Sequence, residues 1–147
     1  MVGQSGSTRK KAPATSKKLH TVSINLLAVA GGAATGAVCR YLLGAWLAAR
    51  LGTGFPYDTL LINLLGCLLI GLILTLAAER LALSEPLRLL LVTGLLGGFT
   101  TFSAFGYETY SLALRGQWPA AILYVATSVL GGLLCVLLGA WLARIAS

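Results

Sequence analysis

The segment from Gly94 to Thr109, GLLGGFTTFSAFGYET, contains groups that can bind ions, although the surrounding chain is apolar. Two adjacent glycines, Gly97 and Gly98, are followed by the β-branched Thr100 and Thr101, a combination that favours a break in a helix. A break leaves backbone N–H and C=O groups without helical partners. Freed carbonyl oxygens can hold a cation, and the N-terminus of a half-helix favours an anion. The segment therefore predicts an ion site.

Aromatic and acidic side chains follow the predicted break at a regular spacing. Phe102, Phe105 and Glu108 recur every three residues, which places them on roughly one stripe of a helix. The edge of a phenylalanine ring carries partial positive charge, so rings presented edge-on could line an anion path without a fixed charge. The alternative is that both rings only pack against other helices. Glu108 is either a gating or proton-linked residue or an interfacial charge.

Two other apolar runs carry polar side chains one helical turn apart. Thr59 and Asn63 are spaced i, i+4, and so are Tyr124 and Ser128. A serine or threonine can bond to the carbonyl one turn earlier in its own helix, which is the simpler interpretation of each hydroxyl taken alone. The carboxamide of Asn63 cannot be satisfied in that way alone, so it needs partners. Arg40 either extends to the lipid headgroups or gives a vestibule a positive field.

Composition indicates that these polar residues belong to a membrane protein. Of 147 residues, 57% are hydrophobic and 10% are charged, whereas a soluble domain carries about 25% charged residues. Four acidic residues and one histidine, His20, are too few for paired-carboxylate catalysis, a Ser–His triad or a His-based metal site. The three cysteines form no CxxC motif and suit apolar packing. We therefore expect no enzyme.

Four apolar runs are long enough to cross a bilayer, which takes about 20 residues. They extend over residues 22–47, 59–78, 87–114 and 118–143, with the third run interrupted. Connectors rich in turn-forming residues separate them. The sequence thus predicts an all-α integral membrane protein in which residues 19–147 form one four-span domain with a broken third helix. An even number of spans places both termini on one side.

Positive charge is concentrated in a polar leader, residues 1–18, whose composition predicts disorder. The apolar run after it begins like a signal peptide but continues to Cys39, which favours an uncleaved first span. Eight basic residues fall on the side of the termini and two on the other, or three and two without the leader. Positive charge sets orientation, so the nearly balanced body is typical of a dual-topology protein. This distribution argues against nucleic acid as a partner.

Glycines recur at spacings that allow close helix contact. Gly32 and Gly36 form a GxxxG motif, and Gly132 and Gly139 are seven residues apart. Small residues let membrane helices approach closely. These glycines pack helices either within one subunit or between the subunits of an oligomer, and the sequence does not separate the two.

Three motifs resemble the CrcB/Fluc family of fluoride channels. They are GGAATGAVCRY at residues 31–41, DTLLINLLGCLLIG at residues 58–71, and GLLGGFTTFSAFGYET at residues 94–109. The resemblance extends over residues 22–145, with the motifs in the family's order and spacing. It implies passive efflux of fluoride from the cytoplasm through the cell (plasma or inner) membrane.

The resemblance also implies an assembly and a set of site residues. The assembly is an antiparallel, dual-topology dimer with two pores and a structural sodium ion (Na+) on its axis. The implied sodium ligands are the main-chain carbonyls of Gly97 and Thr100. The expected fluoride pore residues are Thr59, Asn63, Phe102, Ser103, Phe105, Glu108, Tyr124 and Ser128, with Arg40 in the vestibule.

Some features depart from the family's pattern. Ala104 and Gly132 stand where a hydroxyl residue is often found, so no role is assigned to either. The long basic leader is also atypical and should bias insertion towards cytoplasmic termini. A heterodimer with an oppositely oriented paralogue is therefore an alternative to the homodimer.

Two further function classes fit four short spans. A small multidrug transporter needs a carboxylate in its first span, where this chain has no acid and has Arg40 instead. A non-transporting scaffold is compatible with the hydropathy, but it gives no reason for clustered polar residues or a broken helix at membrane depth.

Overall fold

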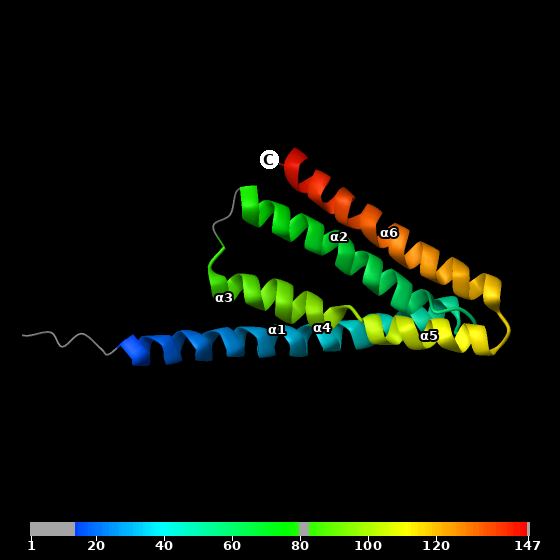
Figure 1. Cartoon of the computed structure of the whole chain (residues 1–147), viewed down its shortest axis with the longest axis horizontal. Coiled ribbons are helices and arrows are strands. Elements are labelled where there is room, and N and C mark those ends of the chain that lie inside the picture. Colours follow the sequence, from blue (N-terminus) through cyan, green and yellow to red (C-terminus); the bar gives the residue numbers. More distant parts are fainter. Residues whose placement is uncertain (1–13, 80–82, 147) are drawn as a thin grey trace, which may run out of the picture.

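The computed structural model describes residues 14–79 and 83–146, with side chains from Lys18 onward, and this part of the chain is all-helical (Figure 1). The elements are α1 (Ala14–Leu51), α2 (Tyr57–Glu79), α3 (Glu85–Arg88), the π-helical η1 (Leu89–Leu96), α4 (Gly97–Phe99), α5 (Phe102–Leu114) and α6 (Trp118–Ile145). The predicted all-α class is confirmed.

Four helical segments of the described chain are long and apolar enough to cross a membrane. They are residues 18–51, 57–79, 85–114 and 118–145, and the third contains α3, η1, α4 and α5. All four predicted spans are therefore present, and the third is interrupted as expected. The first helix begins at Ala14, earlier than the predicted start of the apolar run. Residues 1–13 of the predicted leader lie outside the described residues.

Glycine and proline define the ends of the spans near the connectors. Gly52 and Gly116 follow α1 and α5 with φ angles of 80° and 72°, which side chains with a Cβ rarely adopt. Pro86 and Pro119 lie in the first turns of α3 and α6, where the missing N–H would have no helical partner. Local turn chemistry thus sets the lengths of the helices.

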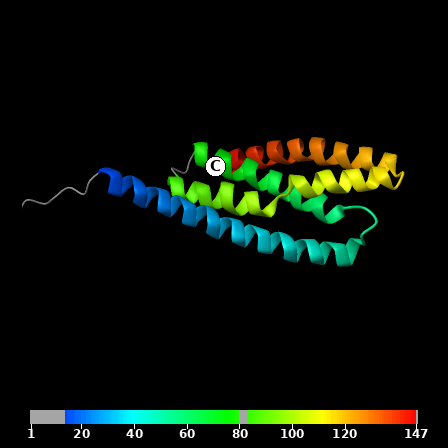
Figure 2. The ribbon, with the colours of Figure 1, turned by 60° about the horizontal axis from the view of Figure 1, so that its bottom comes forward.

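The helices pack in two pairs joined by the third span. α1 runs along η1 and α4, α2 runs along α6, and α5 leaves the first pair to pack on α6 (Figure 1). Figure 2 shows α1 on one side of the bundle and α6 on the other. The start of α1 and the end of α6 lie at the same end of the bundle, as an even number of spans requires.

Glycines make the close contacts within these pairs. A Cβ on Gly32 or Gly36 would collide with the backbone of η1 at Leu90 and Leu95. A Cβ on Gly139 would collide with the backbone of α2 at Leu68. These glycines therefore pack helices inside one subunit, which decides between the two alternatives left open by their spacing.

Candidate functional site

The third span breaks at Thr100 and Thr101 rather than at the adjacent glycines. Gly97 and Gly98 are helical in α4, whereas Thr100 (ψ 158°) and Thr101 (φ −148°, ψ 115°) are extended. The combination of glycines and threonines therefore does mark the break, although the two glycines themselves stay helical. Gly98 instead allows α4 to approach α1, because an added Cβ would lie 2.5 Å from the Ala33 carbonyl oxygen.

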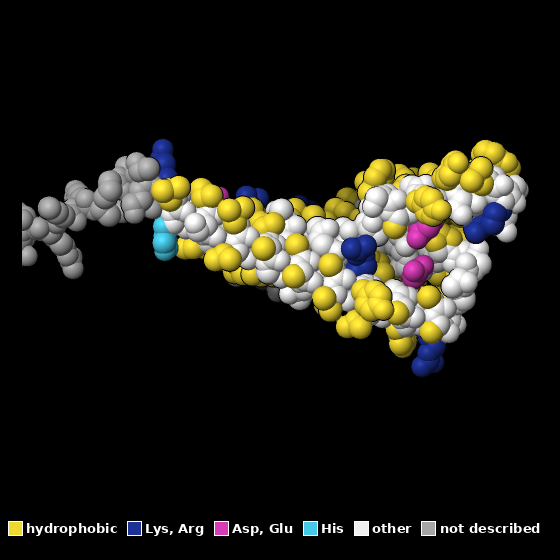
Figure 3. Space-filling model, turned by 90° about the horizontal axis from the view of Figure 1, so that it is seen from below, with side chains coloured by type: hydrophobic (Ala, Val, Ile, Leu, Met, Phe, Trp, Pro, Cys, Tyr) yellow, Lys and Arg dark blue, Asp and Glu magenta, His cyan; other side chains and the backbone are white. Residues whose placement is uncertain are grey.

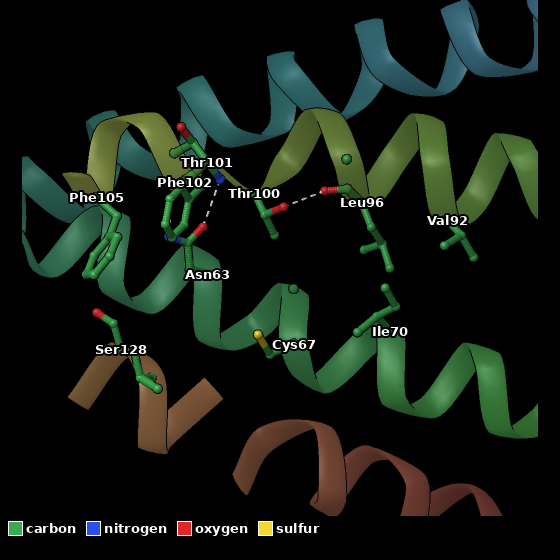
Figure 4. A pocket seen from close by; sticks show the side chains of 13 residues that line it. Asn63, Cys67, Ile70, Val92, Leu96, Thr100, Thr101, Phe102, Phe105 and Ser128 are labelled. Carbon is green, nitrogen blue, oxygen red and sulfur yellow. Dashed lines mark hydrogen bonds between the residues drawn. The ribbon is translucent and has the colours of Figure 1, made fainter. Parts of the chain in front are cut away.

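Asn63 of α2 holds the break in place. Its Nδ2 donates to the Thr101 carbonyl over 3.1 Å, and its Oδ1 accepts from the Thr101 N–H over 2.9 Å (Figure 4). Thr101 Oγ1 accepts from the Ala104 N–H over 3.2 Å and caps the N-terminus of α5. The partners that the carboxamide requires are thus the backbone groups of the break itself.

The break releases the two carbonyls named as sodium ligands from their helical partners. In a continuous helix the Gly97 carbonyl would accept from the Thr101 N–H, which instead donates to Asn63. The Thr100 carbonyl would accept from the Ala104 N–H, which instead donates to the Thr101 hydroxyl. Both are carbonyl oxygens of unwound backbone, a type of ligand that can coordinate a hard cation such as Na+.

The side chain of Arg40, on α1, contacts the same broken span. Its Nε donates to the Gly98 carbonyl over 3.2 Å, at the C-terminal end of the first half of the span, where a positive charge is favourable. Arg40 also lines a pocket of about 290 Å³ with Asp58, Thr59 and Ala104, here called the Arg40 pocket. Its guanidinium is therefore held by the protein rather than extended to the headgroups.

A second and larger pocket lies between α2, the broken span and α6. This central pocket has a volume of about 370 Å³, and four of the predicted pore residues, Asn63, Phe102, Phe105 and Ser128, line it. Phe105 and Ser128 point towards one another across it (Figure 4). The Phe105 ring lies between the Phe102 ring and the Tyr124 ring, with centroids 5.5 and 5.2 Å away. The pocket thus combines neutral hydrogen-bonding groups with aromatic rings.

The Ser128 hydroxyl lacks a hydrogen-bond partner among the described residues, although its oxygen is buried. Its neighbour Thr127 bonds to the Leu123 carbonyl of its own helix over 2.7 Å, which is the simple interpretation proposed for each hydroxyl. Ser128 departs from that pattern. A buried hydroxyl without a partner costs free energy, so it is expected to meet a ligand or water in the central pocket.

Glu108 lies where two predicted pore hydroxyls meet. The Thr59 hydroxyl donates to Oε1 over 2.8 Å, and the Tyr124 hydroxyl donates to Oε2 over 2.7 Å. Tyr124 is fully buried and Thr59 is 5% exposed. Glu108 is thus bonded inside the protein, which disfavours the alternative of a simple interfacial charge. In this arrangement the hydroxyl protons of Thr59 and Tyr124 are both donated to the Glu108 carboxylate.

Comparison with known proteins decides the family. The model of the family described as "CrcB-like protein, Camphor Resistance (CrcB)" matches residues 27–140. The chain is 62% identical over 120 residues to a protein of Chloroflexus aurantiacus, covering 82% of this chain and 95% of the relative. The chain belongs to the CrcB family. A Roseiflexus relative is 53% identical over 122 residues, covering 83% of this chain and 98% of its own length.

These CrcB relatives carry the name "Fluoride-specific ion channel FluC". A further one, from Thermus thermophilus, is 51% identical over 113 residues, covering 77% of this chain and 88% of its own length. With its four apolar helices, this CrcB chain is a multi-pass membrane protein. Ion channels are not enzymes, which agrees with the poor inventory of acids and histidine.

The predicted site residues of this CrcB chain do not all line the same pocket. Ser103 does not line the central pocket; it is exposed, with its hydroxyl oxygen 3.3 Å from that of Thr101. Ala104, which lacks the hydroxyl common in the family, lines the Arg40 pocket instead. An added Cβ at Gly132 would lie 3.3 Å from the Cys67 sulfur, so a glycine suits the tight packing there.

Phe55 is a site neighbour that the sequence did not predict. Its ring stands nearly edge-on to Tyr124, with an interplanar angle of 79° and centroids 5.5 Å apart. It also lines a third pocket, of about 230 Å³, that contains Glu108 and Arg115. Phe55 precedes a proline in a connector, and its position in the sequence indicated only a turn. Only tertiary packing brings it to Tyr124.

Proposed function

We propose that the chain is a fluoride-selective channel that lets fluoride leave the cytoplasm passively and so relieves its toxicity. The observation that carries this proposal is the central pocket. Every described residue that lines it is neutral, and the Ser128 hydroxyl in it has no hydrogen-bond partner among the described residues. Its family relatives are named as fluoride-specific channels. Fluoride is small and strongly hydrated, so a pore must replace its water with hydrogen-bond donors. Neutral donors suit conduction, which needs binding weak enough to release the ion.

Fluoride efflux from liposomes tests the proposal directly. Purified full-length protein is reconstituted in vesicles loaded with potassium fluoride, and valinomycin is added while an electrode records external fluoride. We expect rapid efflux of fluoride and retention of chloride in matched vesicles. Well-folded protein that releases no fluoride would exclude the proposed function.

Replacing Ser128 with alanine is expected to reduce fluoride efflux by about ten-fold. The loss of a hydrogen bond to the fluoride anion, worth about 1.5 kcal/mol, accounts for that size, because about 1.4 kcal/mol corresponds to a factor of ten. Thr127→Ala is the matched control, because the Thr127 hydroxyl is bonded within its own helix. The efflux rate of both variants is compared in the liposome assay. Equal efflux from the two variants would show that the Ser128 hydroxyl does not contribute to fluoride permeation.

The exposed side of the break supports assembly as a dimer. Phe102 is 83% exposed, and the exposed hydroxyl oxygens of Thr101 and Ser103 lie 3.3 Å apart at the break. Irregular backbone at membrane depth has to be covered by protein or line a water-filled cavity, because lipid cannot bond to it. We propose an antiparallel dual-topology homodimer with two pores, surrounded by membrane lipid. The alternative, a heterodimer with an oppositely oriented paralogue, would be favoured if both termini proved accessible from one side of the membrane only.

The freed carbonyls of Gly97 and Thr100 support a structural sodium ion between two subunits. Two oxygens from each subunit of an antiparallel pair would supply four neutral ligands. When bound, the ion would link the two breaks by charge and coordination. The chain's own contribution is to keep both oxygens out of helical hydrogen bonds through Asn63 and the Thr101 hydroxyl.

Removal of sodium is expected to destabilise the dimer and slow fluoride efflux. Protein purified in a large organic cation should unfold at a lower temperature than protein in sodium, since a ligand of the folded state stabilises it by mass action. Adding sodium back should restore both the unfolding temperature and the fluoride efflux. Adding the organic cation at the same ionic strength should restore neither. Unfolding temperatures that do not depend on the cation would argue against the ion.

A further inference from the structure

Two of the three cysteines lie on helices that pack directly on one another. Cys67 is on α2 and Cys135 is on α6, and both residues are partly buried. Leu68 and Val136, the residues that follow them, each have a carbonyl oxygen with which a Cβ on the facing glycine would collide. Both cysteines therefore lie where the backbones of α2 and α6 approach each other closely.

The sulfur of Cys67 lies against the side of α6 that carries Cys135. A Cβ added to Gly132 would lie 3.3 Å from this sulfur. Cys135 follows Gly132 by three residues, which places it one turn further along the same side of the helix. The two thiols are close enough to interact electrostatically. Cys67 and Cys135 thus offer two sulfur ligands between two helices, here called the thiol pair.

The thiol pair adjoins the central pocket. Cys67 lines that pocket, and its side chain is drawn among the lining residues in Figure 4. Ser128, another lining residue, lies two turns before Cys135 on the same side of α6. A ligand bound between the two sulfurs would therefore reduce the free volume of the central pocket.

The number of ligands and their place in the membrane select one kind of metal ion. Thiolates bind soft, thiophilic cations. Structural zinc sites use four protein ligands, and the described residues contain no group of three or more Cys, His, Asp and Glu that could hold a metal ion. A mercuric ion, in contrast, is satisfied by two sulfurs in a line. Two thiolates also cancel its double charge, which is favourable because a net charge at membrane depth is costly.

We propose that Cys67 and Cys135 form a binding site for a two-coordinate, thiophilic divalent cation, with Hg2+ as its representative. Neutral mercuric chloride reaches the thiol pair through the apolar surroundings. Each sulfur displaces one chloride and releases its proton to water, so two S–H bonds break and two S–Hg bonds form without a change in oxidation state. The product is a neutral S–Hg–S bridge that links α2 to α6.

Cys39 supplies the control for this site. It is exposed on α1, which packs along η1 and α4. α1 forms much of the face shown in Figure 3, on the other side of the bundle from α6 (Figure 2). Cys39→Ser leaves the thiol pair intact, whereas Cys67→Ser and Cys135→Ser each remove one of its sulfurs. Alanine replaces serine at either position if the serine variant does not fold.

Intact-mass measurement and thermal unfolding test this site without measuring fluoride transport. The full-length protein in detergent receives one equivalent of mercuric chloride per chain. The unsubstituted protein and Cys39→Ser should gain one mercury and lose two hydrogens, with no chloride retained. Their unfolding temperature, followed by tryptophan fluorescence, should rise by about 5 °C or more, because a cross-link between α2 and α6 restricts the unfolded chain. Cys67→Ser and Cys135→Ser should show neither the bridged mass nor the rise.

The mercury bridge is also expected to reduce fluoride efflux from liposomes by about ten-fold or more, because it narrows the pocket that Cys67 lines. This effect rests on the proposed function. A bridged mass with unchanged efflux would show that fluoride does not pass through the central pocket, while the thiol site itself would be supported. Failure of the metal site and failure of the channel function therefore remain distinguishable.

Four results would overturn the thiol site. A chloride retained on the mercury in Cys39→Ser would mean that the metal is bound by one sulfur only. A mass of two chains joined by mercury in the same variant would mean a bridge between subunits. An equal rise in the unfolding temperature of Cys135→Ser would mean that mercury acts elsewhere. An equal rise with zinc would indicate a site with more ligands than the thiol pair.

Discussion

Replacing Phe105 with isoleucine is expected to reduce fluoride efflux about ten-fold while leaving the protein folded. Isoleucine keeps the apolar volume but removes the ring whose positive edge faces the central pocket opposite Ser128. It also removes ring contacts with Phe102 and Tyr124, at 5.5 and 5.2 Å. Aromatic contacts are worth about 0.5–1.5 kcal/mol, and about 1.4 kcal/mol corresponds to a factor of ten.

The control for this result is the same substitution at Phe99, three residues before Phe102. Phe99 is 8% exposed and packs with Leu47 and Ile62 rather than lining the central pocket. Phe99→Ile should lower the unfolding temperature without changing efflux per folded channel, measured in the liposome assay. Phe102→Ile should behave like Phe105→Ile. Wild-type efflux from Phe105→Ile would show that the rings serve packing alone.

Replacing Asn63 with alanine is expected to destabilise the protein more than any other single change in the pocket. The substitution leaves both the N–H and the carbonyl of Thr101 without the partners they now have. An unpaired buried polar group costs about 1–3 kcal/mol, and lipid offers no replacement. We therefore expect a markedly lower unfolding temperature and loss of fluoride efflux, measured by fluorescence-detected unfolding and the liposome assay.

Two further variants separate the role of the carboxamide from simple loss of volume. Cys67→Ala, one turn along α2, also removes a side chain that lines the central pocket, and it should cost far less stability. Asn63→Asp keeps an acceptor for the Thr101 N–H but cannot donate to the Thr101 carbonyl when ionised. The unfolding temperature of Asn63→Asp should lie between those of Asn63→Ala and Cys67→Ala. Equal stability of Asn63→Ala and Cys67→Ala would mean that Asn63 does not hold the break.

The sequence by itself determined the membrane class, the number of spans and the existence of a break in the third. Span length, connectors with glycine and proline, and low charge are properties of contiguous residues, so they are visible without the fold. The family resemblance then pointed to Asn63, Phe102, Phe105 and Ser128, which the structure places around one pocket. The membrane class, the four spans and the interrupted third span are confirmed because they depend on local chemistry, whereas the pore roles of these four side chains stay predictions.

Tertiary structure alone decided where the break lies and which groups it engages. Gly97 and Gly98 were part of the sequence signal for the break, yet both remain helical, and Gly98 allows close contact with Ala33. The chain opens at Thr101 because Asn63, 38 residues earlier, supplies both bonds that the helix would have made. A hydrogen bond between distant segments has no sequence signature, and neither does a packing contact such as that of Phe55 with Tyr124.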